Sequence, residues 1–429
     1  MSSVVQHPLT AARGIHRQRG VVSIIVALTL AVLIGFVGLA LDLGKLYVAR
    51  SELQNSADAC ALAAARDLTG AIANLSVSEA AGITAGHLNF AMFQRSAVQL
   101  QTDSNVTYSD SLSNPFLPKG SVSSPSSIKY VKCTTSVTNI ANWFMQVLNF
   151  MPGVSIANAS VSATAVATVG AAQTTCAIPV FMCQKSGGHT PGEWLSALGG
   201  NQTTWGSGNF GWAALDGSNS NSEITNELTG NYCSLSSSSA QIGSPGQKAA
   251  SSDAWNTRFG IYGHGFKAPA AGTPGNTPDY TGATYNAATG VSQTSNMYGP
   301  TDAYSRFIQD RLQNTLYQGD TTTGIMTGGT ALSKSDYQSY GADRRIALAP
   351  EVDCSALTVN GTHKTPVLQW DCVLMLQPMD ANAGSAGAGS IIAQVEYLGS
   401  SSTPGSPCAT EGVPGSGSSV GPQVPVLIQ

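Results

Sequence analysis

The sequence predicts an α+β fold. A single N-terminal transmembrane helix continues as a long stalk helix packed on a small antiparallel sheet, and a disulfide-stapled, mainly-β domain follows. Residues 21–41 are apolar and long enough to cross a bilayer. The helical spacing of apolar residues then persists to Leu68, and strand patterns with eight cysteines occupy much of the remainder. We divide the 429 residues into a basic tail (1–20), a membrane helix (21–41), a stalk with an α+β head (42–170) and a loop-rich, mainly-β domain (171–429).

The overall composition argues against nucleic-acid binding. Charged residues make up 10% of the chain and the formal net charge is −4, whereas nucleic-acid binders usually carry a clustered basic face. The chain instead has a polar, uncharged surface rich in Gly, Ser, Thr and Asn.

The membrane helix is expected over residues 21–41, which contain no charge and only two hydroxyl groups, on Ser23 and Thr29. At about 1.5 Å per residue this stretch spans roughly 31 Å, which fits one crossing. A cleaved secretory signal is the alternative. Its apolar region is usually about 7–15 residues long and ends at a small-x-small cleavage site, which is missing directly after Leu41.

The charges around this helix predict its orientation. Three arginines precede it, whereas the basic residues that follow it are interspersed with acidic ones, so the N-terminus is expected to stay in the cytoplasm. Most of the chain then lies outside the cytoplasm, and eight cysteines agree with an oxidising compartment. Asp42, at the outer end of the helix, is expected to be a solvated interface residue.

The stalk and head are predicted from the change in hydrophobic period. Apolar and alanine positions recur at three and four residues up to Leu68, so we expect one helix from Val21 to Leu68, ended by Thr69-Gly70. Two strands, an amphipathic helix and an alternating strand follow at residues 97–110, 127–138, 139–150 and 161–169.

The second domain begins with a long Gly/Ser/Asn/Thr-rich region, residues 184–300, in which regularly placed aromatic residues indicate ordered loops. Strand patterns return at residues 344–353, 366–378 and 391–399, and residues 424–429 could supply a last edge strand. Trp255, Arg258, Phe259 and Tyr262 form a candidate partner surface, with packing inside the loops as the alternative.

The cysteines are expected to form disulfides, because they include no C-x-x-C pair and no Cys/His cluster at zinc spacing. We therefore expect no metal and no cofactor. Cys176 and Cys183 close a short loop, and Cys354 and Cys372 flank the hairpin signal Asn360-Gly361, so each is a candidate pair. Elimination leaves Cys60 with Cys133 and Cys233 with Cys408; the alternative for Cys60 is a small buried thiol.

Residues 17–68, RQRGVVSIIVALTLAVLIGFVGLALDLGKLYVARSELQNSADACALAAARDL, resemble the N-terminal module of the Flp pilus-assembly TadE/TadG-like family of the bacterial tight-adherence system. The resemblance implies an inner-membrane-anchored, non-enzymatic component of pilus assembly or surface adhesion, with a pilin-like stalk and head in the periplasm or at the cell surface. Its implied partners are pilin-like or pilus-secretion proteins.

One position departs from processed prepilins, in which a glutamate stands five residues after the cleavage glycine. Here Ile25 occupies that position after Gly20. A new amine near hydrocarbon would then lack a partner, which is costly. We therefore expect the chain to stay uncleaved, with processing at Gly20 as the alternative.

A narrow face of the membrane helix is a candidate packing surface. Ser23, Ala27, Ala31 and Gly35 recur every four residues, a spacing that allows close helix–helix contact. The alternative is that small residues are simply common in membrane helices.

Two catalytic or metal motifs are rejected. Asp216, Ser218 and Ser220 follow the order that begins a metal-dependent adhesion site, but the region lacks the alternating strands and helices of that fold. Ser419, in a G-x-S-x-G match, lies in a Pro/Gly/Ser tail rather than at a strand-to-helix elbow. The alternative function is a membrane-tethered extracytoplasmic protein that binds or hydrolyses carbohydrate with residues 171–429.

Overall fold

The computed structural model confirms the α+β fold class. It describes residues 19–68, 72–150, 152–198, 210–215, 220–230, 239–242, 249–271, 276–356, 363–381, 391–415 and 419–428. The chain forms two compact units, residues 1–168 with 426–429 and residues 169–425.

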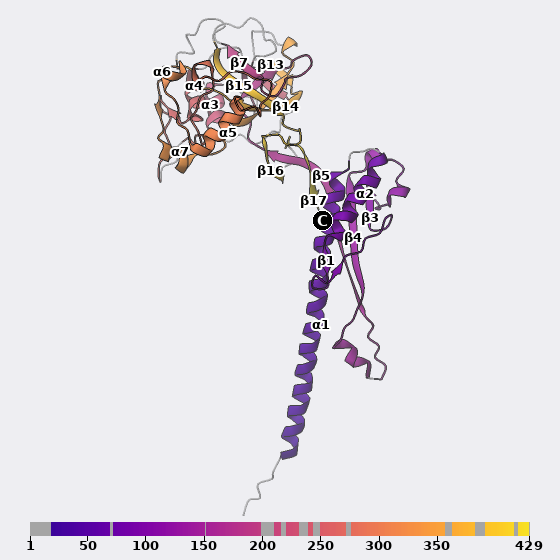
Figure 1. Cartoon of the computed structure of the whole chain (residues 1–429). Helices are drawn as coiled ribbons and strands as arrows, with labels where there is room; N and C mark the ends of the chain where they lie inside the picture. The colour runs from indigo at the N-terminus through magenta and orange to yellow at the C-terminus, as the bar shows by residue number, and fades with distance from the viewer. Residues whose placement is uncertain are drawn as a thin grey trace, which may run out of the picture. The chain divides into compact units, whose positions relative to one another are not determined.

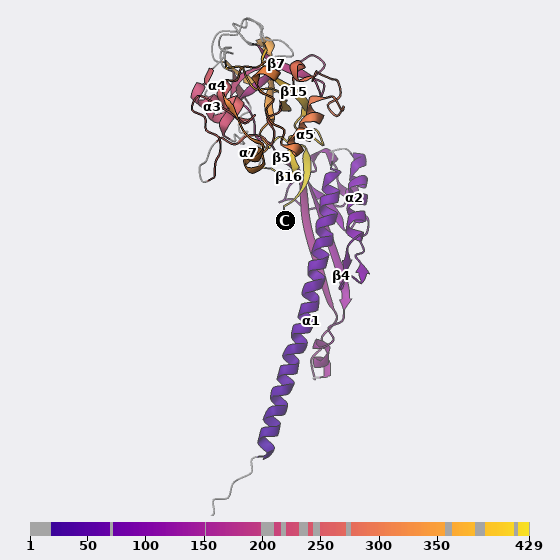
Figure 2. The same cartoon turned by 60° about the vertical axis from the view of Figure 1, so that its left-hand side comes forward.

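The first unit is built around α1 (Arg19–Arg66), whose 48 residues match the predicted continuous helix to within two residues at either end. Within the described residues, one helix, Val22–Arg66, is long and apolar enough to cross a membrane. Its first half is exposed over residues 22–41 apart from Gly38, and it projects from the rest of the unit (Figures 1 and 2). In its second half, Leu53, Ala57, Ala61 and Ala64 are buried, so this half is the spine of the folded head.

A second helix, α2 (Ile72–His87), packs against α1 and was not predicted. A Cβ placed on Gly82 would lie 3.0 Å from both the Ala64 Cβ and the Cys60 carbonyl oxygen, so the two helices approach almost backbone to backbone. The Ser78 hydroxyl donates to the Ala64 carbonyl over 2.7 Å. The segment is rich in Gly, Ser and Ala, and its few large apolar residues, Ile72, Leu75, Val77 and Ile83, do not form the continuous apolar stripe that marks an amphipathic helix.

A five-stranded sheet has the order β16-β5-β4-β3, and β17 pairs with β5. The strands β3 and β4 and residues 159–168 of β5 belong to the first unit and lie against α1, whereas β16 belongs to the second unit. These strands are β3 (Val106–Ser109), β4 (Tyr130–Ile140), β5 (Ala159–Thr174), β16 (Ala409–Pro414) and β17 (Gln423–Leu427). β3, β4 and β5 are antiparallel, and alternate residues of each, such as Val131 and Ala165, are buried with the Ala-rich face of α1.

Short elements complete this unit. They are the pair β1 (Phe90–Ala91) and β2 (Ser96–Ala97) and the 3-10 turns η1 (Lys119–Ser121), η2 (Pro125–Ser127) and η3 (Met145–Phe150). The amphipathic helix predicted at residues 139–150 is wrong. β4 continues to Ile140, and only the six residues of η3 are helical.

The second unit contains an eight-stranded sheet of order β13-β9-β8-β6-β12-β14-β15-β7. The strands are β6 (Val180–Cys183), β7 (Trp194–Leu198), β8 (Phe210–Ala214), β9 (Ser239–Ile242), β12 (Ile346–Val352), β13 (His363–Pro366), β14 (Gln369–Met375) and β15 (Ile391–Ser400). β6 and β12 are parallel, and the other neighbours are antiparallel.

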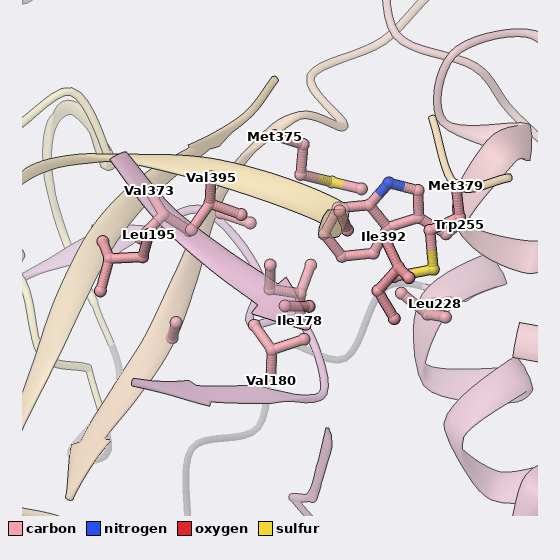
Figure 3. Close-up of a cluster of buried hydrophobic side chains, with 14 of the residues drawn as sticks. Ile178, Val180, Leu195, Leu228, Trp255, Val373, Met375, Met379, Ile392 and Val395 are labelled. Carbon is pink, nitrogen blue, oxygen red and sulfur yellow. The ribbon is translucent and has the colours of Figure 1, made fainter. Parts of the chain in front are cut away.

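Apolar layers cover both faces of this sheet. On one face, Val373 and Met375 of β14 pack with Trp255 and Leu228 of the helices (Figure 3). On the other face, Leu374 packs with Phe307. The remaining elements are α3 (Asn221–Thr229), α4 (Ala249–Thr257), β10 (Ile261–Tyr262), η4 (Ala287–Thr289), α5 (Ala303–Gln313), α6 (Asp320–Thr323), β11 (Thr330–Ala331), α7 (Lys334–Tyr340) and η5 (Cys354–Ala356).

The disulfides correct three of the four predicted pairs. Cys60 on α1 is bonded to Cys133 on β4, as expected. Cys183 is bonded to Cys354 and Cys372 to Cys408, so the predicted pairs Cys176–Cys183, Cys354–Cys372 and Cys233–Cys408 are wrong. The reason is the sheet order. β6 lies beside β12 with Cys183 opposite Val352, two residues before Cys354. Cys176 is also disulfide-bonded, and Cys233 lies outside the described residues.

Candidate functional site

The exposed half of α1 carries the small-residue face. Ser23, Ala27, Ala31 and Gly35 are all exposed, and a Cβ on Gly35 would meet no described atom within 4 Å. The Thr29 hydroxyl donates to the Ile25 carbonyl over 2.8 Å, which satisfies it inside the helix. This half of the helix therefore has an apolar surface, and the side that carries the small residues is narrower than the rest.

The described residues of the turn between β4 and β5, 141–150 and 152–158, lie beside α1, and we call them the hairpin tip (Figure 2). The Asp42 Oδ2 accepts hydrogen bonds from the backbone N–H groups of Phe144, over 2.9 Å, and Met145, over 2.7 Å. Asp42 is only 4% exposed. The expectation of a solvated Asp42 is therefore wrong, because this carboxylate holds the start of η3.

Lys45, one turn further along α1, also holds the hairpin tip. Its ammonium donates to the Ala141 carbonyl over 3.0 Å and lies 4.8 Å from the centre of the Trp143 ring. A carboxylate and an ammonium on one side of α1 thus bind successive residues of the tip.

On the N-terminal side of Asp42, the hairpin tip and α1 line an open groove of about 460 Å³. Ala31 and Gly35 line it from α1, and Phe144 and Val147 line it from the tip. A Cβ on Gly38 would lie 2.7 Å from the Phe144 Cβ, so the glycine makes this approach possible. The outer part of the small-residue face therefore borders the tip, whereas Ser23 and Ala27 lie nearer the N-terminus of α1.

The hairpin tip was missed as a functional element, although the sequence contains a signal for it. No charged residue occurs between Lys132 and Lys185, and this run contains the apolar stretch WFMQVLNFMP. This pattern predicts an amphipathic helix at residues 139–150 with its apolar residues on or near one face. In the structure, Trp143 and Phe150 are exposed.

The predicted partner surface in the second unit is wrong, because Trp255, Arg258, Phe259 and Tyr262 are all buried. The Arg258 guanidinium donates to the carbonyl oxygens of Leu228, over 2.9 Å, and Arg344, over 2.6 Å. These residues hold loops and helices of the second unit together, which is the packing alternative.

The rejected motifs gain no support from the structure. Asp216 and Ser218 lie outside the described residues, and the Ser220 hydroxyl caps α3 by accepting from the Glu223 N–H over 3.2 Å. Ser419 lies between β16 and β17, which are strands. The described residues contain no group of three His, Cys, Asp or Glu side chains placed to hold a metal ion.

Two buried carboxyl groups in the second unit have strongly raised pKa values. Burial, together with Asp302, raises the pKa of Glu396 to about 9, and burial, together with Glu351, raises the pKa of Asp371 to about 8. Such shifts mark catalytic groups only when the group faces a cleft. The open pocket of about 500 Å³ in this unit is lined by residues such as Tyr298 and by neither of these carboxyls.

Comparison with known proteins identifies the N-terminal segment. Residues 20–67 match the model of the Flp pilus-assembly TadE/G-like (Tad) family. No curated protein and no solved structure matches the chain. The matched residues coincide with α1, both its exposed half and the half buried in the head. The chain therefore carries, along α1, the TadE/G-like module of Flp pilus assembly that its sequence resembles.

Proposed function

We propose that this protein is a non-enzymatic, membrane-anchored component of Flp pilus assembly or surface adhesion. It works by packing the exposed half of α1 against membrane helices of pilin-like or pilus-secretion proteins. The Tad match at residues 20–67 and the exposed apolar half of α1 support this role. The three arginines before residue 21 support a cytoplasmic N-terminus in the inner membrane, with the two units in the periplasm or at the cell surface.

The observation that carries the proposal is the narrow side of α1 at Ser23 and Ala27. Helices in lipid associate through close van der Waals contact rather than through the hydrophobic effect, and small residues permit that contact. Both residues are exposed in the isolated chain and lie outside the groove that the hairpin tip borders. This exposed side of α1 can therefore pack against a second helix.

A matched pair of substitutions tests the packing surface. Ala27→Leu adds bulk to the narrow side. Ala40→Leu makes the same change about 220° around the helix, at roughly 100° per residue. We expect Ala27→Leu to reduce crosslinking of the full-length chain to pilus-machinery proteins in native membranes by about tenfold, which corresponds to about 1.4 kcal/mol. Ala40→Leu should leave it unchanged. Equal crosslinking by both variants would contradict the proposed surface.

The alternative function, carbohydrate binding or hydrolysis, draws on the open pocket of the second unit, where Tyr298 is 69% exposed. Exposed aromatic rings are typical of surfaces that bind partners. Binding of glycans or turnover of glycosides by the purified full-length chain would favour this function. We place pilus assembly first, because the carboxyl groups with raised pKa values do not line that pocket.

A further inference from the structure

The hairpin tip is unusually apolar for an element at the surface of the head. Trp143 is 72%, Val147 58% and Phe150 91% exposed. The 52 residues from Cys133 to Gln184 contain no charged side chain. Exposed side chains of this size, gathered on one short segment, mark a surface that meets another apolar phase or a partner.

The tip lies at the depth of the bilayer if α1 crosses it. Phe144 contacts Gly38, and Val147 lines the groove with Gly35 and Ala31. Gly38, Gly35 and Ala31 precede Leu41, the outer end of the apolar stretch, by about 4.5, 9 and 15 Å along the helix at roughly 1.5 Å per residue. Because the hydrocarbon core is about 30 Å thick, the tip reaches from the interface into the nearer leaflet.

The backbone of the tip is provided with hydrogen-bond partners, which hydrocarbon would not supply. Asp42 accepts from the N–H groups of Phe144 and Met145. The Asn149 side-chain amide both accepts from the Ile156 N–H and donates to its carbonyl oxygen. Further side-chain amides join the two arms of the turn, Asn142 to the Ala157 carbonyl over 3.3 Å and Gln146 to Asn158 over 2.7 Å.

The side chains where the hairpin tip meets Lys45 of α1 are of the types found at a lipid–water boundary. Lys45 lies one turn beyond Asp42 and contacts both the Ala141 carbonyl and the Trp143 ring. Tryptophan and lysine are enriched at this level of membrane proteins, because each has an apolar body and a polar end.

We propose that the hairpin tip, residues 141–150 and 152–158, inserts into the leaflet of the bilayer nearest the head and contacts lipid acyl chains beside α1. The head then has two membrane contacts, a spanning helix and a shallow loop. This inference depends on α1 spanning the membrane and not on any pilus partner.

Fluorescence quenching by brominated lipid tests the insertion. Trp143 is well suited, since the other five tryptophans all follow residue 193 in the sequence. The purified full-length chain is reconstituted in liposomes of phosphatidylcholine with or without bromine on the acyl chains. We expect bromine to reduce the emission of the wild type, and Trp143→Phe to abolish most of that reduction. The same absolute loss of emission in both proteins would overturn the proposal.

Photocrosslinking separates lipid from a protein partner. A benzophenone side chain is placed at position 150 in the tip or, as a control, at position 88, where Leu88 is 76% exposed beyond α2. Mass spectrometry of the full-length chain from cells should find phospholipid adducts at position 150 and none at position 88. Adducts only to polypeptide at position 150 would identify the tip as a protein-docking surface and refute lipid insertion.

Discussion

The attachment of the hairpin tip to α1 can be tested through Asp42. Its Oδ2 accepts two backbone N–H groups, from Phe144 over 2.9 Å and from Met145 over 2.7 Å, and the residue is 4% exposed. Asp42→Ala removes both hydrogen bonds and leaves two N–H groups without their acceptor. Asp42→Asn keeps an oxygen of similar position but removes the charge.

The expected loss follows from these contacts. Hydrogen bonds to a charged group contribute about 1.5–3 kcal/mol each. Because both bonds share one oxygen, we take about 3 kcal/mol for the pair, which corresponds to roughly a 100-fold increase in the population of the detached tip. Asp42→Asn should lose about 1 kcal/mol, since two neutral hydrogen bonds remain possible.

Hydrogen exchange of the full-length chain in detergent or nanodiscs measures this opening. Peptides that contain residues 141–150 should exchange roughly 100-fold faster in Asp42→Ala and less than tenfold faster in Asp42→Asn, if exchange follows the open population. Peptides from α2 serve as an internal control and should not change. If Asp42→Ala and the wild type exchange at the same rate in the tip, Asp42 does not hold it and our reasoning is wrong.

Three further outcomes are expected. Gly82→Val should destabilise the first unit by about 1–3 kcal/mol, because the valine side chain would push α2 away from α1. Denaturant unfolding followed by circular dichroism measures this loss of stability, and an unchanged unfolding midpoint would contradict the close packing of the two helices. Cys60→Ser combined with Cys133→Ser should cost about 4 kcal/mol, because the bond closes a loop between residues 73 apart; limited proteolysis of the head should become faster, and equal rates would count against this stabilisation. Burial and Asp302 raise the pKa of Glu396 from 4.5 to about 9, so the folded protein holds a proton that the unfolded chain releases. The free energy of unfolding of the second unit should therefore fall as the pH rises from about 4.5 to about 9, and this group contributes at most about 1.4 kcal/mol per pH unit. The melting temperature of Glu396→Gln should change less with pH over that range than the melting temperature of the wild type.

Local patterns in the sequence were sufficient to predict an element where the spacing of its apolar residues determined both the type of element and the face that is buried. α1 was predicted because its apolar and alanine positions keep the helical period from the apolar stretch into the head. β4 and β5 were predicted because Val131, Cys133 and Thr135 alternate with outward residues, as do Ala163 and Ala165. The prediction of α2 failed because Gly82 and other small residues pack closely without a strong apolar stripe.

Features that depend on distant parts of the chain could not be predicted in this way. The Cys183–Cys354 bond requires β6 to lie beside β12, and nothing near either cysteine encodes that order. The prediction for the hairpin tip failed for a different reason. Its apolar residues predict an amphipathic helix, whereas Trp143 and Phe150 are exposed in a turn beside α1.

The pairing of β17 with β5 has a consequence for biosynthesis. The Ile428 N–H donates to the Val166 carbonyl, so the edge of β5 opposite β4 is completed by residues made more than 250 positions later. A ribosome delivers β5 long before β17, and in the meantime that edge offers free N–H and carbonyl groups to any other extended chain. Truncated products that lack β17 are therefore expected to aggregate or to be degraded.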